Sequence, residues 1–164
     1  MEKKKSKKTS EYSPIETSEY STLILGQTPQ KEKPAKVNNT IIKLLTDPKN
    51  KPLKEKVLTE LKNENAKNIL IDAISNSTST KALPAIVAAC WETGIDFSSH
   101  LSFFVDLAIK NDYLVCLEAL TVIENMEGPF NQEEVDICLN KLQAPLLKNS
   151  ENYQLLMAIN NHLK

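Results

Sequence analysis

Residues 101–125 read LSFFVDLAIKNDYLVCLEALTVIEN and contain two apolar patterns of helical period in succession. The apolar positions of the first pattern are Leu101, Phe104, Val105, Ala108 and Ile109. Two polar residues follow at positions 111 and 112. The apolar positions of the second pattern are Leu114, Leu117, Leu120 and Ile123. Apolar residues that recur every three or four positions are typical of an amphipathic helix. The stretch therefore predicts two consecutive helices joined by a short turn.

The same period extends over residues 37–164, and no stretch alternates apolar and polar residues for long enough to predict a strand. Helices are expected to start near residues 52, 66, 81, 98, 112 and 131, and a last helix carries Leu155, Leu156 and Ile159. Because the helix of residues 52–64 is rich in lysine, we expect it to be a polar N-terminal cap of the helical domain.

Helix ends are predicted from residues that favour caps and stops. Gly94 is expected to end the helix that starts near residue 81, since glycine readily adopts the left-handed conformation found after helices. Ser98 or Ser99 is expected to cap the next helix, and residues 111–112 to begin the one after it. Asn131 is expected to cap a helix whose acidic first turn complements the helix dipole.

Alternate helix starts lie about 30 residues apart, so the predicted unit is a helix pair. The second helices of two units look alike, because Ile69-Leu70 and Ala73-Ile74 match Phe104-Val105 and Ala108-Ile109. A single pair of this size cannot bury its own apolar face, so neighbouring pairs must stack and share a core. We therefore expect an all-α fold, a short right-handed α-solenoid of seven or eight helices.

Over residues 37–164 the sequence resembles HEAT and armadillo-like repeat proteins, with Pro84 in the position of the proline of the first HEAT helix. Residues 89–97 and 118–128 are also similar to a set of small HEAT-like proteins from Bacteroidetes-type bacteria. The resemblance implies a solenoid fold and supplies no activity.

Residues 1–36 differ in composition from the rest of the chain. They hold a lysine run from Lys3 to Lys8, recurrent serine and threonine, and three prolines. This composition predicts a disordered Lys-rich tail that precedes a helical domain over residues 37–164. No apolar run has the length of a membrane span or of a secretory segment, so we expect a cytoplasmic protein.

The composition argues against several classes of function. All 20 basic residues are lysines, so the chain lacks the arginine fork that reads bases, and sequence-specific nucleic-acid binding is not expected. The three glycines form no phosphate-binding loop. Cys90, Cys116 and Cys138 lie in apolar helical patterns without metal-ligand spacing, so we expect core thiols, no metal and no cofactor.

Charge is distributed unevenly along the chain. Residues 1–81 carry 16 lysines and 10 acidic residues, whereas residues 82–136 carry one lysine and 10 acidic residues. A basic partner would be attracted to such a block. We predict an adaptor that binds a basic protein segment through Trp91, Glu92, Asp96, Glu118, Thr121 and Asn125. In the alternative interpretation Trp91 belongs to the core and the carboxylates form a solvated surface.

Three further possibilities stay open. Glu92 and Glu118 are candidates for the paired carboxylates of a small hydrolase, although no catalytic site is defined and we do not expect an enzyme. The Lys-rich tail could contact nucleic acid weakly, without sequence preference. The apolar last helix, with Leu155, Leu156, Met157 and Ile159, either docks on the core or pairs with a second copy as a homodimer.

Overall fold

The computed structural model describes Lys43, Leu45 and residues 64–148 and 151–164. All of these residues belong to the unit Lys31–Lys164. Six α-helices and one 3-10 helix lie between Glu64 and Lys164: α4 (Glu64–Ser75), α5 (Leu83–Glu92), η1 (Ser98–His100), α6 (Leu101–Lys110), α7 (Tyr113–Glu124), α8 (Gln132–Leu147) and α9 (Tyr153–His162). The described residues contain no strand, which confirms the all-helical prediction for this part of the chain.

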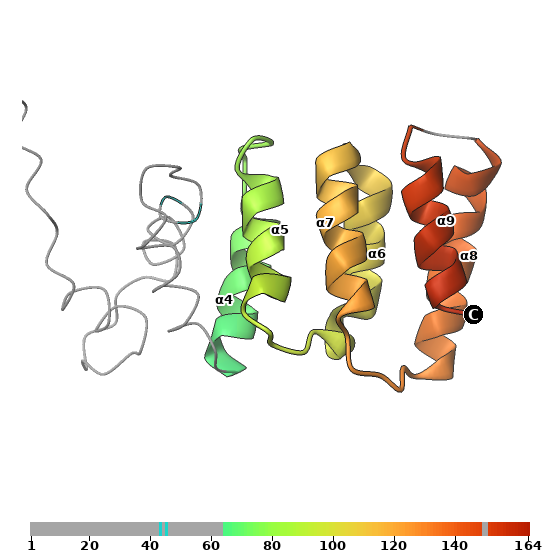
Figure 1. Cartoon of the computed structure of the whole chain (residues 1–164), viewed down its shortest axis with the longest axis horizontal. Coiled ribbons are helices and arrows are strands. Elements are labelled where there is room, and N and C mark those ends of the chain that lie inside the picture. The colour runs from blue at the N-terminus through green and yellow to red at the C-terminus, as the bar shows by residue number, and fades with distance from the viewer. Residues whose placement is uncertain (1–42, 44, 46–63, 149–150) are drawn as a thin grey trace, which may run out of the picture. The chain divides into compact units, whose positions relative to one another are not determined.

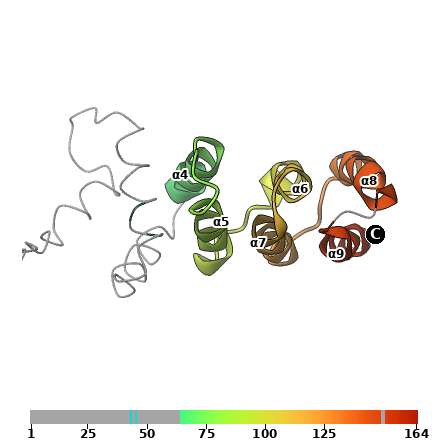
Figure 2. The same ribbon diagram turned by 90° about the horizontal axis from the view of Figure 1, so that it is seen from above.

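The six helices form three antiparallel pairs, α4 with α5, α6 with α7, and α8 with α9 (Figure 1). The pairs lie side by side, and the view from above shows two rows of helices (Figure 2). In one row α5 packs on α7 and α7 packs on α9, while in the other α6 packs on α8. In the middle pair, α7 is therefore covered by its own partner and by a helix of the pair on either side, while α6 packs mainly on α7 and α8.

The helices pair differently from the prediction, by a shift of one helix along the chain. The matching sequences at residues 69–74 and 104–109 belong to α4 and α6, which are the first helices of their pairs, not the second. The two-residue connection of Asn111 and Asp112 brings α6 and α7 together as a hairpin, so residues 104–109 lie on the first helix of that pair.

Most predicted helix ends are confirmed. After α5, Gly94 has φ of +68° and its amide donates to the carbonyl of Trp91 at 3.1 Å. The carboxylate of Asp112 accepts from the amide of Val115 at 3.1 Å and caps α7. At the start of α8, Asn131 accepts from the amides of Glu133 at 2.8 Å and Glu134 at 3.4 Å.

The prediction that Ser98 or Ser99 caps the helix at residue 98 is wrong. The residue before α6 is His100, and it makes no side-chain cap. The Ser98 hydroxyl donates to Asp96, and the Ser99 hydroxyl lies 3.0 Å from Nδ1 of His100. The amide of Ser102 in the first turn of α6 donates instead to a carboxylate oxygen of Glu134, from α8, at 3.2 Å. A residue from another helix pair has taken the place of the local cap.

The core runs between the two rows of helices. Phe97 and Phe104 are almost completely buried, and their rings meet edge to face with centroids 5.6 Å apart. The three cysteines are buried and free, as predicted for core thiols. Leu156 and Ile159 of α9 are buried as well, and α9 packs on α7 and α8. The last helix thus docks on the core, and its pairing with a second copy stays a prediction.

Several predictions fall on residues that the structure does not describe. These are the tail of residues 1–36, the domain boundary at residue 37 and nearly all of the predicted cap helix at residues 52–64. Within the described ranges, every helix is too short or too polar to cross a lipid bilayer.

Candidate functional site

The centre of the predicted binding surface is a contact between α5 and α7. The indole Nε1 of Trp91 donates to Oε2 of Glu118 at 2.8 Å. The two residues are 27 positions apart, and they meet because α5 and α7 stack as equivalent helices of successive pairs. Trp91 retains 37% of its surface exposed, so it is not a core residue. We call this contact the Trp91–Glu118 pair.

Asp96, another residue of the predicted surface, connects two loops of the fold. Its Oδ1 accepts from the amide of Ser98 at 2.9 Å and from the amide of Glu127 at 3.2 Å. It therefore joins the α5–α6 connection to the α7–α8 connection. Partial burial raises the pKa of this carboxyl, but the hydrogen bonds from Ser98 and Glu127 and the charge of Lys67 outweigh that effect, so the pKa is lowered.

The remaining predicted residues flank the Trp91–Glu118 pair. Thr121 lies one turn after Glu118 on α7, and its hydroxyl donates to the carbonyl of Leu117 at 3.0 Å. Asn125 follows the last residue of α7 and donates to the carbonyl of Thr121 at 2.8 Å. Glu92 is half-buried at the end of α5, beside Trp91 in sequence. The structure thus joins Trp91 with Glu118, while the hydrogen bonds of Thr121 and Asn125 stay within their own helix.

Many of the acidic residues gather at one end of the helices. The hydrogen bond between Asp96 and Glu127 shows that the α5–α6 and α7–α8 connections lie together. The carboxylates in or beside these connections form what we call the acidic loop edge: Glu92, Asp96, Glu124, Glu127, Glu133 and Glu134. The acidic block of the sequence is thereby concentrated at the end of α5 and α7, close to Trp91.

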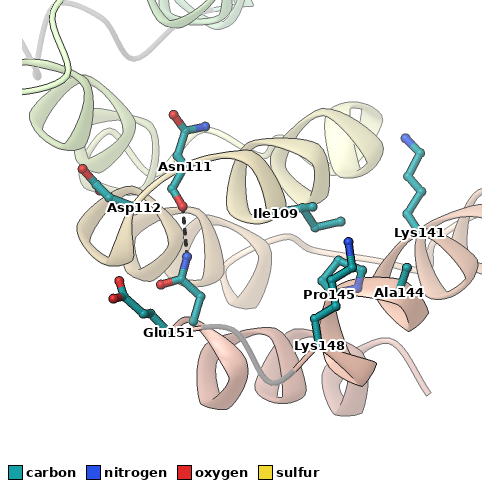
Figure 3. Close-up of a pocket in the computed structure, with 9 residues that line it drawn as sticks. Ile109, Asn111, Asp112, Lys141, Ala144, Pro145, Lys148 and Glu151 are labelled. Atoms are coloured by element: carbon teal, nitrogen blue, oxygen red, sulfur yellow. Dashed lines mark hydrogen bonds between the residues drawn. The ribbon is translucent and has the colours of Figure 1, made fainter.

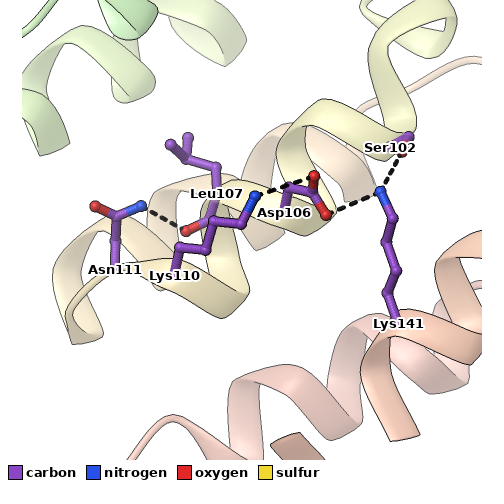
Figure 4. Close-up of polar contacts among 6 residues, drawn as sticks. All are labelled: Ser102, Asp106, Leu107, Lys110, Asn111 and Lys141. Carbon is purple, nitrogen blue, oxygen red and sulfur yellow. Dashed lines mark hydrogen bonds and ion pairs between the residues drawn. The ribbon is translucent and has the colours of Figure 1, made fainter. Parts of the chain in front are cut away.

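A polar seam that the sequence analysis missed joins α6 to α8 (Figure 4). Lys141 of α8 donates to Oγ of Ser102 at 2.8 Å and pairs with Asp106 at 2.9 Å, and Lys110 pairs with the same carboxylate at 3.3 Å. Burial acts to raise the pKa of Asp106, but the hydrogen bonds and charges of Lys141 and Lys110 prevail and lower it. Only the pair of Asp106 and Lys110, four residues apart on one helix, had a sequence signal.

A pocket of about 560 Å³ lies at the opposite end of the helices from the acidic loop edge. It is lined by the end of α6 and the turn after it, the last turns of α8, and residues at the start of α9. Figure 3 shows Asn111, Asp112 and Glu151 on one side of it and Lys141, Pro145 and Lys148 on the other. The amide Nδ2 of Asn152 donates to the carbonyl of Asn111 at 3.0 Å across the wall.

The described residues offer little for nucleophilic or metal chemistry. Burial raises the pKa of the Cys116 thiol to about 11 and that of Cys90 further, so both thiols stay protonated at neutral pH. His100 contacts Ser99 rather than a cysteine. Within the described ranges, no three His, Cys, Asp or Glu side chains are grouped closely enough to hold a metal ion.

The fold thus places the partly exposed indole ring of Trp91 against the half-buried carboxylate of Glu118. Comparison with protein-family models, curated proteins and solved structures finds no match for this chain.

Proposed function

We propose that the chain is a protein–protein interaction module that binds a basic segment of a partner at the Trp91–Glu118 pair and the neighbouring acidic loop edge. The observation that carries the proposal is the hydrogen bond from the indole of Trp91 to Glu118. It fixes a carboxylate against the edge of an aromatic ring that remains 37% exposed. An exposed tryptophan beside acidic groups is a suitable anchor for a cationic side chain.

We further propose that the stacked pairs are part of a short α-solenoid, as the resemblance to HEAT and armadillo-like proteins implies. The packing of α5 on α7, α7 on α9 and α6 on α8 supports translation of one pair onto the next. Stacking of this kind aligns equivalent helices, which accounts for the approach of two residues 27 positions apart. The binding surface is therefore made jointly by successive repeats.

The cation would interact with both members of the pair. A lysine or arginine over the indole ring is attracted by the negative face of the aromatic system. Glu118 lies at the ring edge and can accept a hydrogen bond from the same cation through the carboxylate oxygen that Trp91 does not use. The acidic loop edge adds a longer-range attraction that raises the association rate and weakens with salt.

Calorimetric titration of the full chain with a short lysine- and arginine-rich peptide tests this function. We expect saturable binding that weakens as salt is added, and no binding of a matched peptide with glutamate in place of each basic residue. Trp91→Leu and Glu118→Gln should each weaken Kd about fivefold, which corresponds to a loss of about 1 kcal/mol.

Asp72→Asn is the matched control, because it removes one negative charge from an exposed side chain in the last turn of α4, away from the acidic loop edge, and should leave Kd unchanged. Circular dichroism of each variant shows whether the helices are retained. Equal affinity of the basic and acidic peptides, or unchanged Kd in both Trp91→Leu and Glu118→Gln, would contradict the proposed surface.

A further inference from the structure

The pocket of about 560 Å³ at the end of α6, α8 and α9 has two walls of different chemistry. One wall carries oxygen atoms, from Asn111 and Asp112 in the α6–α7 turn and from Glu151 and Asn152 at the start of α9. The other belongs to α8 and carries Lys141 and Lys148, although the ammonium group of Lys141 is bound to Ser102 and Asp106 (Figure 3). The pocket is therefore polarised, with negative and positive sides facing a common space.

The oxygen wall contains a hydrogen-bond acceptor that the fold does not use. The side-chain amide of Asn111 donates to the carbonyl of Leu107 at 2.9 Å. The side-chain amide of Asn152 donates to the carbonyl of Asn111. Its Oδ1 is buried and has no hydrogen-bond partner among the described residues. A buried acceptor without a donor is unfavourable, and Asn152 is only 8% exposed. A donor that enters beside Asn152 would remove this cost.

The two lysines of the other wall differ in how far their charge is already paired within the fold. Lys141 is engaged by Ser102 and Asp106 in the polar seam. Lys148, at the end of α8, is exposed and lies on the pocket lining. Between the two walls, Ile109, Ala144 and Pro145 supply apolar surface. This combination of an apolar lining with a few polar groups at its sides is typical of a small-molecule site.

From these observations we propose that the pocket binds a small zwitterion, either a free amino acid or a dipeptide. Its ammonium group lies at the oxygen wall, where Asp112 and Glu151 supply negative charge and Asn152 accepts a hydrogen bond. Its carboxylate lies at Lys148. A simple anion would be repelled by the carboxylates, and a simple cation would be repelled by the lysines. Only a ligand with both charges therefore matches both walls.

This ligand site is separate from the proposed peptide-binding surface. Asp112 and Glu151 lie at the end where α6 joins α7 and α8 joins α9, whereas the acidic loop edge lies at the other end. Either site can therefore fail its test while the other passes.

Nuclear magnetic resonance titration of the full chain is the direct test, with L-alanine and L-alanyl-L-alanine as the two zwitterionic probes. We expect saturable shifts of the backbone amides at residues 109–112, 144–148 and 151–152. N-acetyl-L-alanine, which lacks the ammonium group, and L-alanine amide, which lacks the carboxylate, should bind at least about fivefold more weakly. The tighter of the two zwitterions distinguishes an amino-acid site from a dipeptide site.

Two variants and two matched controls complete the experiment. Glu151→Gln and Lys148→Gln should each weaken binding about fivefold. Asp136→Asn on α8 and Lys81→Gln before α5 change the same charges on exposed residues that do not line the pocket, and should leave affinity unchanged. The proposal is overturned if neither zwitterion gives saturable shifts, if the capped derivatives bind equally well, or if both pocket variants bind as the parent does.

Discussion

Single residues at the helix ends determine where the chain changes direction. Gly94 follows α5 with φ of +68°, a left-handed conformation that side chains with a Cβ adopt at a cost. No atom lies within 4 Å of the position that a Cβ would take there. Gly94→Ala should therefore destabilise the protein by about 1 kcal/mol through backbone strain alone, measured as the free energy of unfolding in urea.

Gly94→Asn is the informative comparison, because asparagine tolerates the left-handed conformation better than alanine does. We expect its loss of stability to be smaller than that of Gly94→Ala. If the two variants lost the same free energy, or if alanine were neutral, backbone strain at Gly94 would not be what ends α5.

Asp96, which the sequence analysis assigned to the binding surface, also serves the fold. Its carboxylate oxygen accepts hydrogen bonds from amides on two connections, so it holds those connections together. The sequence could not reveal this, because Glu127 donates through its backbone amide, which every residue except proline possesses.

Between elements, α6 and α8 are joined by charged side chains as well as by apolar packing. Asp106 has a lowered pKa in the folded protein, so the folded state binds its proton more weakly than the unfolded chain does. Its contribution to stability is present above the unfolded value, about pH 4, and is lost as the pH falls through the lowered folded value. The side chains of Asp106 and Lys141 are each about one-third exposed, which limits the contribution to about 1 kcal/mol or less.

Asp106→Asn tests this pH dependence. At neutral pH the parent should be more stable than the variant by up to about 1 kcal/mol, and the difference should shrink as the solution is acidified below about pH 4. Urea unfolding over a series of pH values measures it. If the stability difference between the parent and Asp106→Asn stayed constant through this range, the ionised carboxylate would not be the stabilising group. If the carboxylate acts through Lys141, the stability difference should be smaller when it is measured in a Lys141→Met background.

At this scale the sequence predicted the helices well and their cross-connections poorly. Helical period, Gly94 and Asn131 indicated where elements begin and end because these signals are local. The contact of the Trp91–Glu118 pair could also be predicted from the sequence, because equivalent helices of a repeat pack against each other. Lys141 and Ser102 are 39 residues apart and on differently patterned helices, so nothing local linked them. The pocket was missed for the same reason, because three separate segments build it.

Across the described helices, packing places α7 at the centre, in contact with α5, α6 and α9. In a stacked array each pair is stabilised mainly by its neighbours, so pairs with neighbours on both sides open less often. We therefore expect the backbone amides of α7 to exchange with solvent more slowly than those of α8 and α9. Native-state hydrogen exchange measures these rates residue by residue.

Buried residues of α7 and α8, such as Ile123 and Leu142, provide the comparison, since both are fully covered by the core. Equal protection of all helices would indicate that the array unfolds as one cooperative block. Faster exchange in α7 than in α8 would contradict the stacking of repeats as the source of its stability.

The bond from Trp91 to Glu118 also gives the molecule a native optical reporter. The chain contains one tryptophan, so all indole fluorescence comes from the place where α5 meets α7. Indole emission responds to the polarity and charge around the ring. Separation of these two helices would shift the spectrum towards that of hydrated indole, whereas a cation placed over the ring would alter the emission with the helices still in contact. Opening of the array and occupation of its surface can thus be followed separately in the unlabelled protein.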